Sequence, residues 1–379
     1  MEKIKVLLVS KFYHPVKGGV ENHIKLLTES IKEKFPITVL CCNTKRKTEV
    51  EEKDGLKIVK VGSIGTLRSM PLSPTFPSWV RKIKADILHF HLPFPLGVIS
   101  YFLAKPEGKI IITWHSDIVR QKIGRLFYHP FLIRFLKKAD VIIATSPNMI
   151  ESSSYLKRFK EKCKVIPLGI DVERFKLKED EEERVKKIRE KYISGKGIIL
   201  FVGRLIYYKG VEYLIRAMRD VDATCLIIGE GKLKKKLEKM VDELGLSSKM
   251  HFLGSVSDEE LPLYYHACDV FCLPSVAKSE AFGIVQLEAM ACGKPCVSTD
   301  LPTGVPFVNQ NGKTGIIVPP KNPDALAKAI NTLLDDPALR EKYGSYAKER
   351  VKRKFKREVM VKRIIEVYQE VLKKQDRCT

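Results

Sequence analysis

The sequence lacks any run of about eighteen apolar residues, so no segment is long enough to cross a bilayer as a helix. It also lacks a short-period repeat and a long low-complexity tract, which excludes a solenoid and a largely disordered chain. No secretory leader pattern is present, because residues 1–5 lead directly into the first apolar run. We therefore expect a cytoplasmic protein.

Nine cysteines are an odd number without a secretory leader, which predicts reduced thiols instead of a disulfide framework. Four of them form two C-x3-C pairs, a spacing that suggests zinc: Cys268, Cys272, Cys292 and Cys296. Two of these lie in apolar, strand-like runs, and small buried thiols explain the set better than metal ligands. We expect no metal at these positions.

Acidic residues are too few to balance the basic ones. The chain has 68 Lys and Arg against 45 Asp and Glu, a formal net charge of +23, which indicates an anionic partner or surface. Nucleic acid is the ordinary interpretation, but the cations are spread over segments such as 232–239 and 348–357 and form no known nucleic-acid motif. We expect no nucleic acid. Abundant Lys and Glu also occur in proteins from hot habitats, and the sequence does not separate these causes.

One basic segment, residues 121–138, alternates apolar residues with cations. The pattern is typical of a helix in a membrane interface, which predicts peripheral contact with an anionic membrane, on its inner face. A core helix with one solvated face is the alternative. The apolar members are Ile123, Leu126, Phe127, Phe131, Leu132 and Phe135, and the cations are Lys122, Arg125, Arg134, Lys137 and Lys138.

Short apolar or β-branched runs alternate with helical stretches, which is typical of parallel α/β sheets. The first series is 4–9, 37–42, 56–61, 86–90, 109–114, 140–145 and 163–167. The alternation restarts at Gly197, with runs at 223–229, 250–254, 269–273, 295–299 and 314–318. We predict two α/β domains with doubly wound parallel sheets, residues 1–172 and 173–355, followed by a helical segment 356–379.

Glu280 and Glu288 lie eight positions apart around Phe282-Gly283, near the start of an apolar helical stretch that Gly293 ends. Eight helical residues rise about 12 Å, so the two carboxylates cannot converge on one atom. Glycosidases need two carboxyls about 5–10 Å apart, whereas this spacing fits the sugar and ribose ends of a nucleoside diphosphate sugar. The N–H groups of the first turn could bind the phosphates between them. Alternatively, Glu280 caps the helix and Glu288 faces solvent.

A second motif, residues 201–210, is predicted to form a strand, a loop and the start of a helix. Gly203 frees the backbone at the strand end, and Arg204 and Lys209 place two cations at the carboxyl edge of a parallel sheet, where such sheets bind ligands. Charge-assisted contacts of this kind contribute about 1.5–3 kcal/mol each, enough to bind a diphosphate without a metal. In so basic a chain, both could also be ordinary surface cations.

These motifs resemble those of the large family of retaining glycosyltransferases usually numbered four, which have the GT-B fold. Besides the four charged residues, the resemblance includes the glycine-bearing loop 18–21 and the segments 113–117 and 166–171, and it covers nearly the whole chain. It implies two Rossmann-like domains facing a cleft, with the acceptor on the first and the donor on the second. It also implies that the C-terminal helix crosses back to the first domain.

For the charged residues, the resemblance implies a division of roles. Arg204 and Lys209 would bind the donor diphosphate. Glu288 would hold the ribose, and Glu280 would hold the transferred sugar. His115 would lie near that sugar.

The resemblance also implies backbone contacts to the donor, at positions rich in glycine. These are Gly18 and Gly19 in the first domain and Gly203, Phe282, Gly283 and Ile284 in the second. The chain departs from many relatives in one place, because residues 301–307 lack their second glycine and acidic residue. A backbone contact from Gly304 or Val305 is still expected there, whereas an acidic contact is not.

Other polar residues have two interpretations each. His89 and His91 alternate at one strand end and could line an acceptor cleft, or each could be a satisfied structural histidine; the same holds for His14. Asp220-Val221-Asp222 resembles the metal motif of the other glycosyltransferase architecture, but it precedes its strand, so we expect no metal there.

The predicted reaction is metal-independent, retaining transfer of a hexose, weakly favoured to be mannose-like, from a nucleoside diphosphate sugar to a hydroxyl of a polysaccharide, oligosaccharide or lipid-linked acceptor. The expected catalytic residues are His115, Arg204, Lys209 and Glu280, and the nucleotide sugar is a substrate, so no cofactor is expected. Two alternatives stay open at this point. One is a nucleotide-sugar epimerase of the same architecture, and the other is an inactive basic surface-binding protein.

Overall fold

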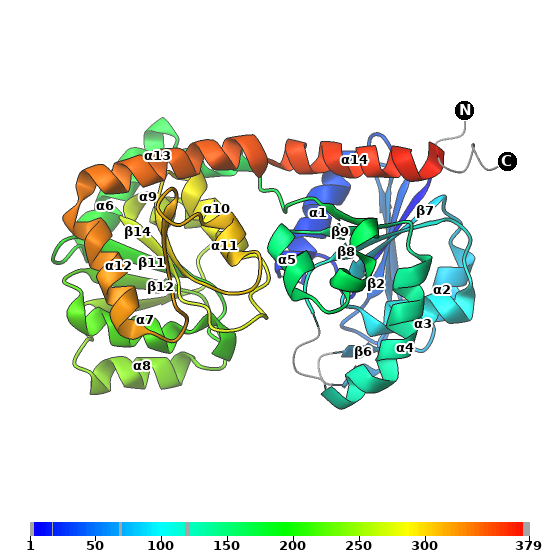
Figure 1. Ribbon diagram of the computed structural model, residues 1–379, viewed down its shortest axis with the longest axis horizontal. Helices are drawn as coiled ribbons and strands as arrows, with labels where there is room; N and C mark the ends of the chain where they lie inside the picture. Colours follow the sequence, from blue (N-terminus) through cyan, green and yellow to red (C-terminus); the bar gives the residue numbers. More distant parts are fainter. Residues whose placement is uncertain (1–3, 17, 68–69, 118–121, 374–379) are drawn as a thin grey trace. The chain divides into compact units, whose positions relative to one another are not determined.

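The computed structural model describes residues 4–16, 18–67, 70–117 and 122–373. The chain divides into two compact units, one formed by the residues up to Gly169 together with those from Arg357 onward, and the other by Ile170–Lys356 (Figure 1). We call them unit 1 and unit 2. Within the described ranges, none of the helices combines the length and the apolar character needed to span a bilayer.

Unit 1 is built on an eight-stranded sheet in the order β10-β9-β8-β7-β1-β2-β4-β3. Neighbouring strands are parallel, except that β3 runs antiparallel to β4. Every residue of β1, β7 and β9 is buried, as expected for the centre of a parallel sheet that is covered on both faces. The strands are β1 (Val6–Val9), β2 (Ile37–Cys42), β3 (Glu49–Lys53), β4 (Leu56–Val61), β7 (Ile87–Leu92), β8 (Lys109–Trp114), β9 (Val141–Ala144) and β10 (Cys163–Val165).

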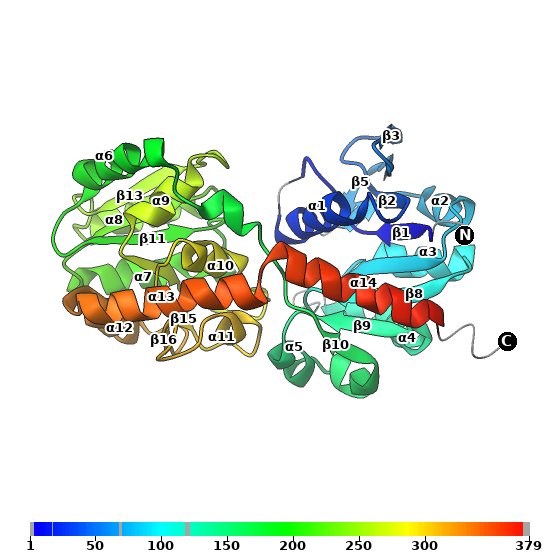
Figure 2. The ribbon, with the colours of Figure 1, turned by 90° about the horizontal axis from the view of Figure 1, so that it is seen from above.

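Helices cover both faces of this sheet. On one face α1 (Gly19–Ile31) lies beside α14 (Arg357–Lys373), and both contribute apolar side chains to one core with β1 and β2 (Figure 2). The other face carries α2 (Phe76–Lys82), α3 (Pro95–Ala104) and α4 (Lys122–Lys138). A separate hairpin and two short helices complete the unit: β5 (Gly65–Leu67) with β6 (Met70–Leu72), α5 (Pro147–Ser152) and the 3-10 helix η1 (Leu156–Lys162).

Unit 2 contains a wholly parallel six-stranded sheet in the order β13-β12-β11-β14-β15-β16. The strands are β11 (Ile198–Val202), β12 (Thr224–Ile228), β13 (Met250–Gly254), β14 (Val270–Leu273), β15 (Cys296–Thr299) and β16 (Gly315–Val318). The 3-10 helices are η2 (Val172–Phe175), η3 (Glu179–Glu181), η4 (Tyr207–Lys209) and η5 (Met218–Asp220). The helices are α6 (Glu182–Tyr192), α7 (Val211–Ala217), α8 (Lys234–Glu243), α9 (Leu261–Ala267), α10 (Ile284–Ala291), α11 (Val305–Val308), α12 (Pro323–Asp335) and α13 (Pro337–Lys354). Helices α7, α8 and α12 pack on one face of the sheet, while α6, α9 and α10 lie on the other (Figure 1).

Both sheets are wound in the same way. Numbered along the chain, the parallel strands of unit 2 follow the order 3-2-1-4-5-6, and those of unit 1 follow the same order with a seventh strand added. This is the doubly wound Rossmann order, in which ligands bind beyond the carboxyl ends of the two strands where the winding reverses. The reversal lies between β1 and β7 in unit 1 and between β11 and β14 in unit 2. The predicted fold class of two Rossmann-like parallel-sheet domains is confirmed.

Helix α4 corresponds to the segment proposed to lie in a membrane interface. Gln121 and the side chains of residues 122–127 lie outside the described part of the chain. In the described part, Leu132 and Phe135 are buried, and the Phe135 ring packs 4.8 Å from that of Phe90. The cations Arg134 and Lys137 are exposed. This half of α4 therefore buries one face in the core and exposes the other, and contact of the exposed face with a membrane stays a prediction.

The loop between β11 and α7 depends on a glycine with a left-handed backbone. Gly210 has φ +66°, and a Cβ added there would lie 2.1 Å from the carbonyl oxygen of Pro274, just after β14. The N–H of Val276 donates to the Tyr208 carbonyl at 2.8 Å, which fastens the same loop to the β14 end. The close approach of the two backbones thus requires a glycine.

This close approach predicts that two glycine-to-alanine substitutions at the same φ lower the free energy of unfolding by different amounts. Gly245, which follows α8, also has φ +66°, but an added Cβ would meet nothing within 4 Å. Gly245→Ala should cost only the left-handed strain of about 1–2 kcal/mol. Gly210→Ala should cost about 1–3 kcal/mol more, because the chain must also relieve the overlap. Equal shifts of the two denaturation midpoints would contradict the close approach.

Candidate active site

A buried ion pair lies where the winding of the unit 2 sheet reverses. The Lys209 Nζ, at the end of the loop after β11, is 2.6 Å from Oε2 of Glu280, in the loop after β14. The Ser275 hydroxyl donates to the same carboxylate oxygen at 3.0 Å. Lys209 and Glu280 are only 8% and 7% exposed, so their mutual attraction is weakly screened by water. The structure thus brings together two residues that the sequence motifs had placed separately.

Arg204 supplies a second cation from the same loop. Its guanidinium donates to the Tyr208 hydroxyl at 3.2 Å and is otherwise exposed, so it can reach a ligand. Gly203 leaves room for the Lys209 side chain, because a Cβ at this position would lie only 3.3 Å from it. Two cations therefore lie at the carboxyl end of β11, where anionic ligands of Rossmann-like sheets bind.

Glu288 lies within α10 and is held by a different partner. The Tyr265 hydroxyl donates to Glu288 Oε2 at 2.7 Å. Burial raises the pKa of the Glu288 carboxyl, although the hydrogen bond from Tyr265 and the charges of Arg174 and Lys209 lower it. Glu288 is thus an acceptor in an environment that opposes its negative charge, unlike Glu280, which has a lysine partner.

The N-terminus of α10 points its backbone toward the same edge of the sheet. Gly283 is the left-handed residue before the first turn, Phe282 is buried beside it, and Ile284 begins the helix. The first-turn N–H groups of a helix have no intrahelical acceptors and favour anions. The N–H of Gly304, however, already donates to the Ala281 carbonyl at 2.7 Å. The backbone contact expected from Gly304 or Val305 stays a prediction.

The other sequence-predicted residues belong to unit 1. Gly18 precedes the first turn of α1 and Gly19 begins it, and an added Cβ at Gly19 would meet nothing within 4 Å. His115 follows β8 and is 6% exposed. All three follow the carboxyl ends of β1 or β8, at or beside the reversal point of the unit 1 sheet.

The histidines at the β7 end have distinct environments. His89 is fully buried, and its two ring nitrogens are 2.8 Å from the Tyr368 hydroxyl and 2.7 Å from the Thr113 hydroxyl. His89 therefore fits the second interpretation, a structural histidine whose ring nitrogens both have partners. His91 is also buried, but its Nδ1 lies 3.0 Å from Nε2 of His115. His91 can thus orient the His115 ring.

The cysteine pairs lie in the interior of unit 2. All four thiols are buried, and burial raises the pKa of Cys268 to about 12 and also raises those of Cys272, Cys292 and Cys296. Four small buried side chains fit the core packing expected from the sequence, and the absence of a metal there stays a prediction.

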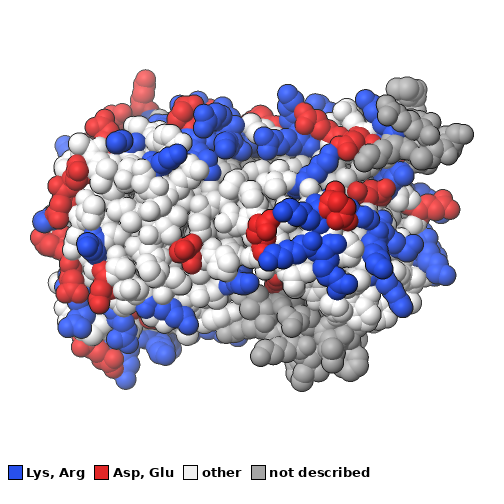
Figure 3. All heavy atoms as spheres, viewed as in Figure 1, with Lys and Arg blue, Asp and Glu red and all other residues white. Residues whose placement is uncertain are grey.

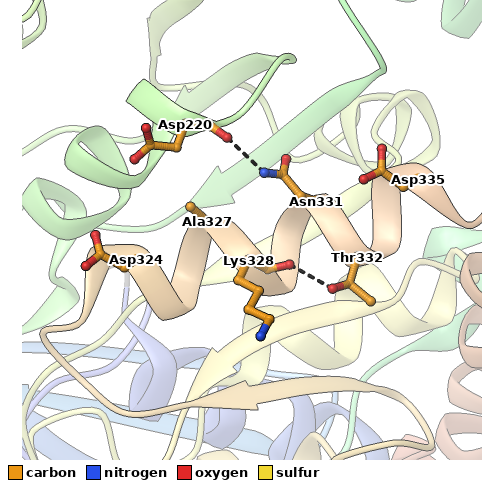
Figure 4. A pocket seen from close by; sticks show the side chains of 7 residues that line it. All are labelled: Asp220, Asp324, Ala327, Lys328, Asn331, Thr332 and Asp335. Atoms are coloured by element: carbon orange, nitrogen blue, oxygen red, sulfur yellow. Dashed lines mark hydrogen bonds between the residues drawn. The ribbon is translucent and has the colours of Figure 1, made fainter.

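A groove in unit 2 contains Asp220 of the discarded acidic motif (Figure 4). It has a volume of about 510 Å³ and lies between η5 and α12, where the Asn331 amide donates to the Asp220 carbonyl at 2.8 Å. Because Asp220 precedes β12, the groove lies near the amino edge of the sheet, opposite to Lys209. It therefore plays no part in the candidate site.

The excess positive charge is spread over the surface. Figure 3 shows Lys and Arg with acidic residues among them, including a group of cations over the α5 and η1 region of unit 1. Exposed members near these elements are Lys137, Lys138, Lys157, Arg158 and Lys160. Glu151 pairs with Lys160 at 2.9 Å, so the charge there is partly balanced.

Two residues of the candidate site, and one buried histidine outside it, were missed from the sequence. Ser275 follows β14 and could have been noticed as a hydroxyl just beyond a buried strand, next to the expected ligand edge. Tyr265 lies on α9, and nothing in its spacing links it to Glu288. His23 lies on the buried face of α1 with Ile24 and Leu27, where the apolar periodicity hides it.

Comparison with known proteins identifies the family. The model for Glycosyl transferases group 1 matches residues 180–350, and that for Glycosyltransferase Family 4 matches residues 17–174. The O-antigen chain mannosyltransferase C of Escherichia coli is 31% identical over 97% of this chain and 99% of its own length. The chain belongs to the group 1 glycosyltransferases. The family resemblance seen in the sequence motifs is thereby confirmed.

Two further comparisons agree with this family and with its fold. The D-rhamnosyltransferase WbpZ of Pseudomonas aeruginosa is 36% identical over 72% of this chain and 70% of its own length. The sucrose-phosphate synthase of Thermosynechococcus elongatus superposes with a TM-score of 0.82 over 97% of this chain and 99% of that one, at 23% identity. That likeness concerns the fold, which is GT-B.

The raised pKa of Glu288 predicts a stability change with pH. A carboxyl whose pKa is higher in the folded than in the unfolded protein destabilises the fold as pH rises above its unfolded value of about 4.5. Glu288→Gln keeps an acceptor for Tyr265 and removes the charge. The free energy of unfolding of the variant relative to wild type should therefore rise with pH above about 4.5. Urea denaturation across this range measures it, and a pH-independent difference would contradict the assigned environment.

Proposed function

We propose that this glycosyltransferase moves a mannose-like hexose from a nucleoside diphosphate sugar to a hydroxyl of a polysaccharide, oligosaccharide or lipid-linked acceptor, with retention of configuration and without a metal. The observation that carries the proposal is the Lys209–Glu280 pair beside the exposed Arg204. It offers cations for the diphosphate and an acid for the sugar at one sheet edge.

The contacts of Glu280 favour its role as the sugar-binding acid. Both Lys209 and Ser275 contact Oε2, so they hold the carboxylate in one orientation. We assign the other oxygen, Oε1, to hydroxyls of the transferred sugar. Glu288 would accept from the ribose hydroxyls, because its partner Tyr265 already holds it as an acceptor. The backbone at Phe282, Gly283 and Ile284 would contact the phosphates between the two acids.

Catalysis in this proposal is electrostatic. Arg204 and Lys209 would stabilise the charge that develops on the departing diphosphate, and the first-turn N–H groups of α10 would add to this. The acceptor would attack from the side of the departing group, whose phosphate oxygen takes the acceptor proton. In unit 1, the glycines Gly18 and Gly19 would approach the phosphates, and His115 would orient the sugar.

The relatives support the choice of sugar. One is named a mannosyltransferase and the other a D-rhamnosyltransferase, and D-rhamnose is the 6-deoxy form of mannose. The first is also named for the O-antigen chain, a polysaccharide, which favours a role in polysaccharide biosynthesis. We therefore propose a GDP-linked donor.

Peripheral contact with an anionic membrane is part of the proposal. Ile99 and Leu103 on α3 and Phe131 on α4 are exposed apolar side chains, 36%, 57% and 39% accessible. The exposed cations Arg134 and Lys137 follow on α4. Apolar side chains next to cations suit the interface of a membrane that carries anionic lipids.

Loss of either member of the buried pair should abolish transfer. Lys209→Ala and Glu280→Gln should each lower kcat by at least about 100-fold, the usual result of removing one preorganised stabilising group. Lys239→Ala removes a lysine whose pair with Glu243 is exposed, and it should leave kcat unchanged. Initial rates with GDP-mannose and an oligosaccharide acceptor measure this. Unchanged turnover in both site variants, with circular dichroism showing folded protein, would refute the assignment.

Ligand-induced stabilisation should identify the donor and separate the two acids. A ligand at a hundred times its dissociation constant adds about 2.7 kcal/mol of stability, so thermal shifts with GDP-, UDP- and ADP-sugars can be ranked. We expect GDP-mannose to rank first. Glu280→Gln should keep the shift caused by GDP alone but lose the extra shift from the sugar, whereas Glu288→Ala should lose both. A larger thermal shift with a UDP-sugar would refute GDP as the donor nucleotide, and the assignment as a glycosyltransferase would stand.

A further inference from the structure

Three histidines from different elements of unit 1 meet in its interior. His23 comes from α1, His91 from β7 and His115 from the end of β8, and each is at most 6% exposed. One ring nitrogen of each lies within 4.8 Å of the corresponding nitrogens of the other two. The His91 and His115 rings are stacked 5.3 Å apart, and the His23 ring stands edge-on to both. Three imidazoles therefore face one another around a common point.

Several of these nitrogens are buried without a partner. Among the described residues, neither nitrogen of His23 nor Nε2 of His91 has a hydrogen-bond partner. An unsatisfied buried polar atom costs about 1–3 kcal/mol, so three of them in one cluster need an explanation. Packing alone does not supply one, because an apolar residue would fill the same space at no such cost. An ion bound through one nitrogen of His23 would remove one of these costs.

We propose that His23, His91 and His115 form a binding site for a divalent transition-metal ion of the zinc class. Neutral imidazole suits Zn²⁺, Co²⁺ and Ni²⁺, whereas Mg²⁺ prefers oxygen ligands. Three histidines with an open fourth position are a known zinc arrangement, with Zn–N distances of about 2.0–2.1 Å. His91 Nδ1 and His115 Nε2 are hydrogen-bonded to each other at 3.0 Å, so an ion bound through both would replace that hydrogen bond.

The surroundings favour this site in two ways. His89 stacks on His91 at 4.6 Å and is itself fixed by Tyr368 and Thr113, so the central ligand is held in place. Burial lowers the pKa of His23 to about 4 and lowers those of His91 and His115 well below the usual value, so all three are neutral at physiological pH. Neutral imidazoles are the form that binds metals.

The ion would inhibit the enzyme and would not be its cofactor. Ligation uses a nitrogen of His115 and fixes its ring, so His115 can no longer adjust to the transferred sugar. This consequence rests on the proposed role of His115 in transfer, whereas the binding itself does not. The effector is therefore a transition-metal ion that inhibits transfer by binding His115. Catalysis proceeds when the ion is absent.

Cobalt titration of the full, reduced, chelator-treated protein tests the binding directly. We expect one equivalent of Co²⁺ to bind, with the visible bands of a four-coordinate site and without thiolate-to-cobalt charge transfer, because the cysteines are not ligands. Zn²⁺ should displace it and Mg²⁺ should not. Absence of stoichiometric binding, or a thiolate spectrum, would overturn the proposal.

Two matched variants localise the site. His23→Gln should weaken Co²⁺ binding by more than about 100-fold, since loss of even an outer-shell partner costs about 10–100-fold. His129→Gln changes an exposed histidine of α4 in the same unit and should bind as wild type does. Equal affinity of wild type and His23→Gln would refute the site. If His23→Gln does not fold, the imidazole ¹⁵N chemical shifts of the wild-type protein can be followed while Zn²⁺ is added. Shift changes confined to His23, His91 and His115 would support the site, and shift changes at other histidines instead would refute it.

Activity then separates this inference from the proposed function. Zn²⁺ should inhibit transfer by wild type, whereas folded His23→Gln should keep its basal rate and resist inhibition. Cobalt binding at the triad without any sugar transfer would leave the metal site intact and refute the proposed function. Sugar transfer without cobalt binding would refute the metal site and leave the proposed function intact.

Discussion

The buried Lys209–Glu280 pair is the interaction on which the candidate site depends. A lysine and a glutamate that are less than a tenth exposed lose most of their hydration, and each is tolerable there only because of the other. The pair forms because β11 and β14 are neighbours in the sheet although β12 and β13 separate them in the chain. Gly210 lets the two loops touch, and Ser275 fixes the shared carboxylate oxygen. Strand order, backbone freedom and charge thus converge on one contact.

The two units show how one winding supports two kinds of chemistry. In unit 2 the reversal edge carries Arg204, Lys209 and Glu280, groups that interact with charge and hydroxyls. In unit 1 the corresponding region carries glycines and neutral buried histidines. A charged edge attracts an anionic donor over some distance, whereas neutral imidazoles discriminate by position and shape. The same fold can therefore divide attraction and orientation between its halves.

The sequence predicted the strands better than the contacts between them. Buried parallel strands are continuous apolar runs, so 37–42, 109–114 and 269–273 were recognisable, whereas β3 was missed because its residues Glu49–Lys53 are mostly charged and lie at the sheet edge. Glu280 and Lys209 were both predicted as ligand residues, but their pairing was not, since it requires the strand order. His23 was missed for a related reason. The apolar periodicity of α1 predicts only that this face of the helix is buried. The packed structure is needed to show that His23 faces His91 and His115.

The two acids of the donor motif are held in opposite ways, and this difference has a physical rationale. Glu280 is compensated by a lysine and a serine, so it is preorganised as a carboxylate at little cost to folding. Glu288 has a tyrosine as its close partner, and burial raises its pKa, so its charge works against the fold. A ligand that donates hydroxyl hydrogens to Glu288 would relieve that strain, and part of the binding energy would come from it. A nucleoside bound there would then stabilise unit 2 beyond the sum of its own contacts, which explains why an unfavourable acid would be kept within α10.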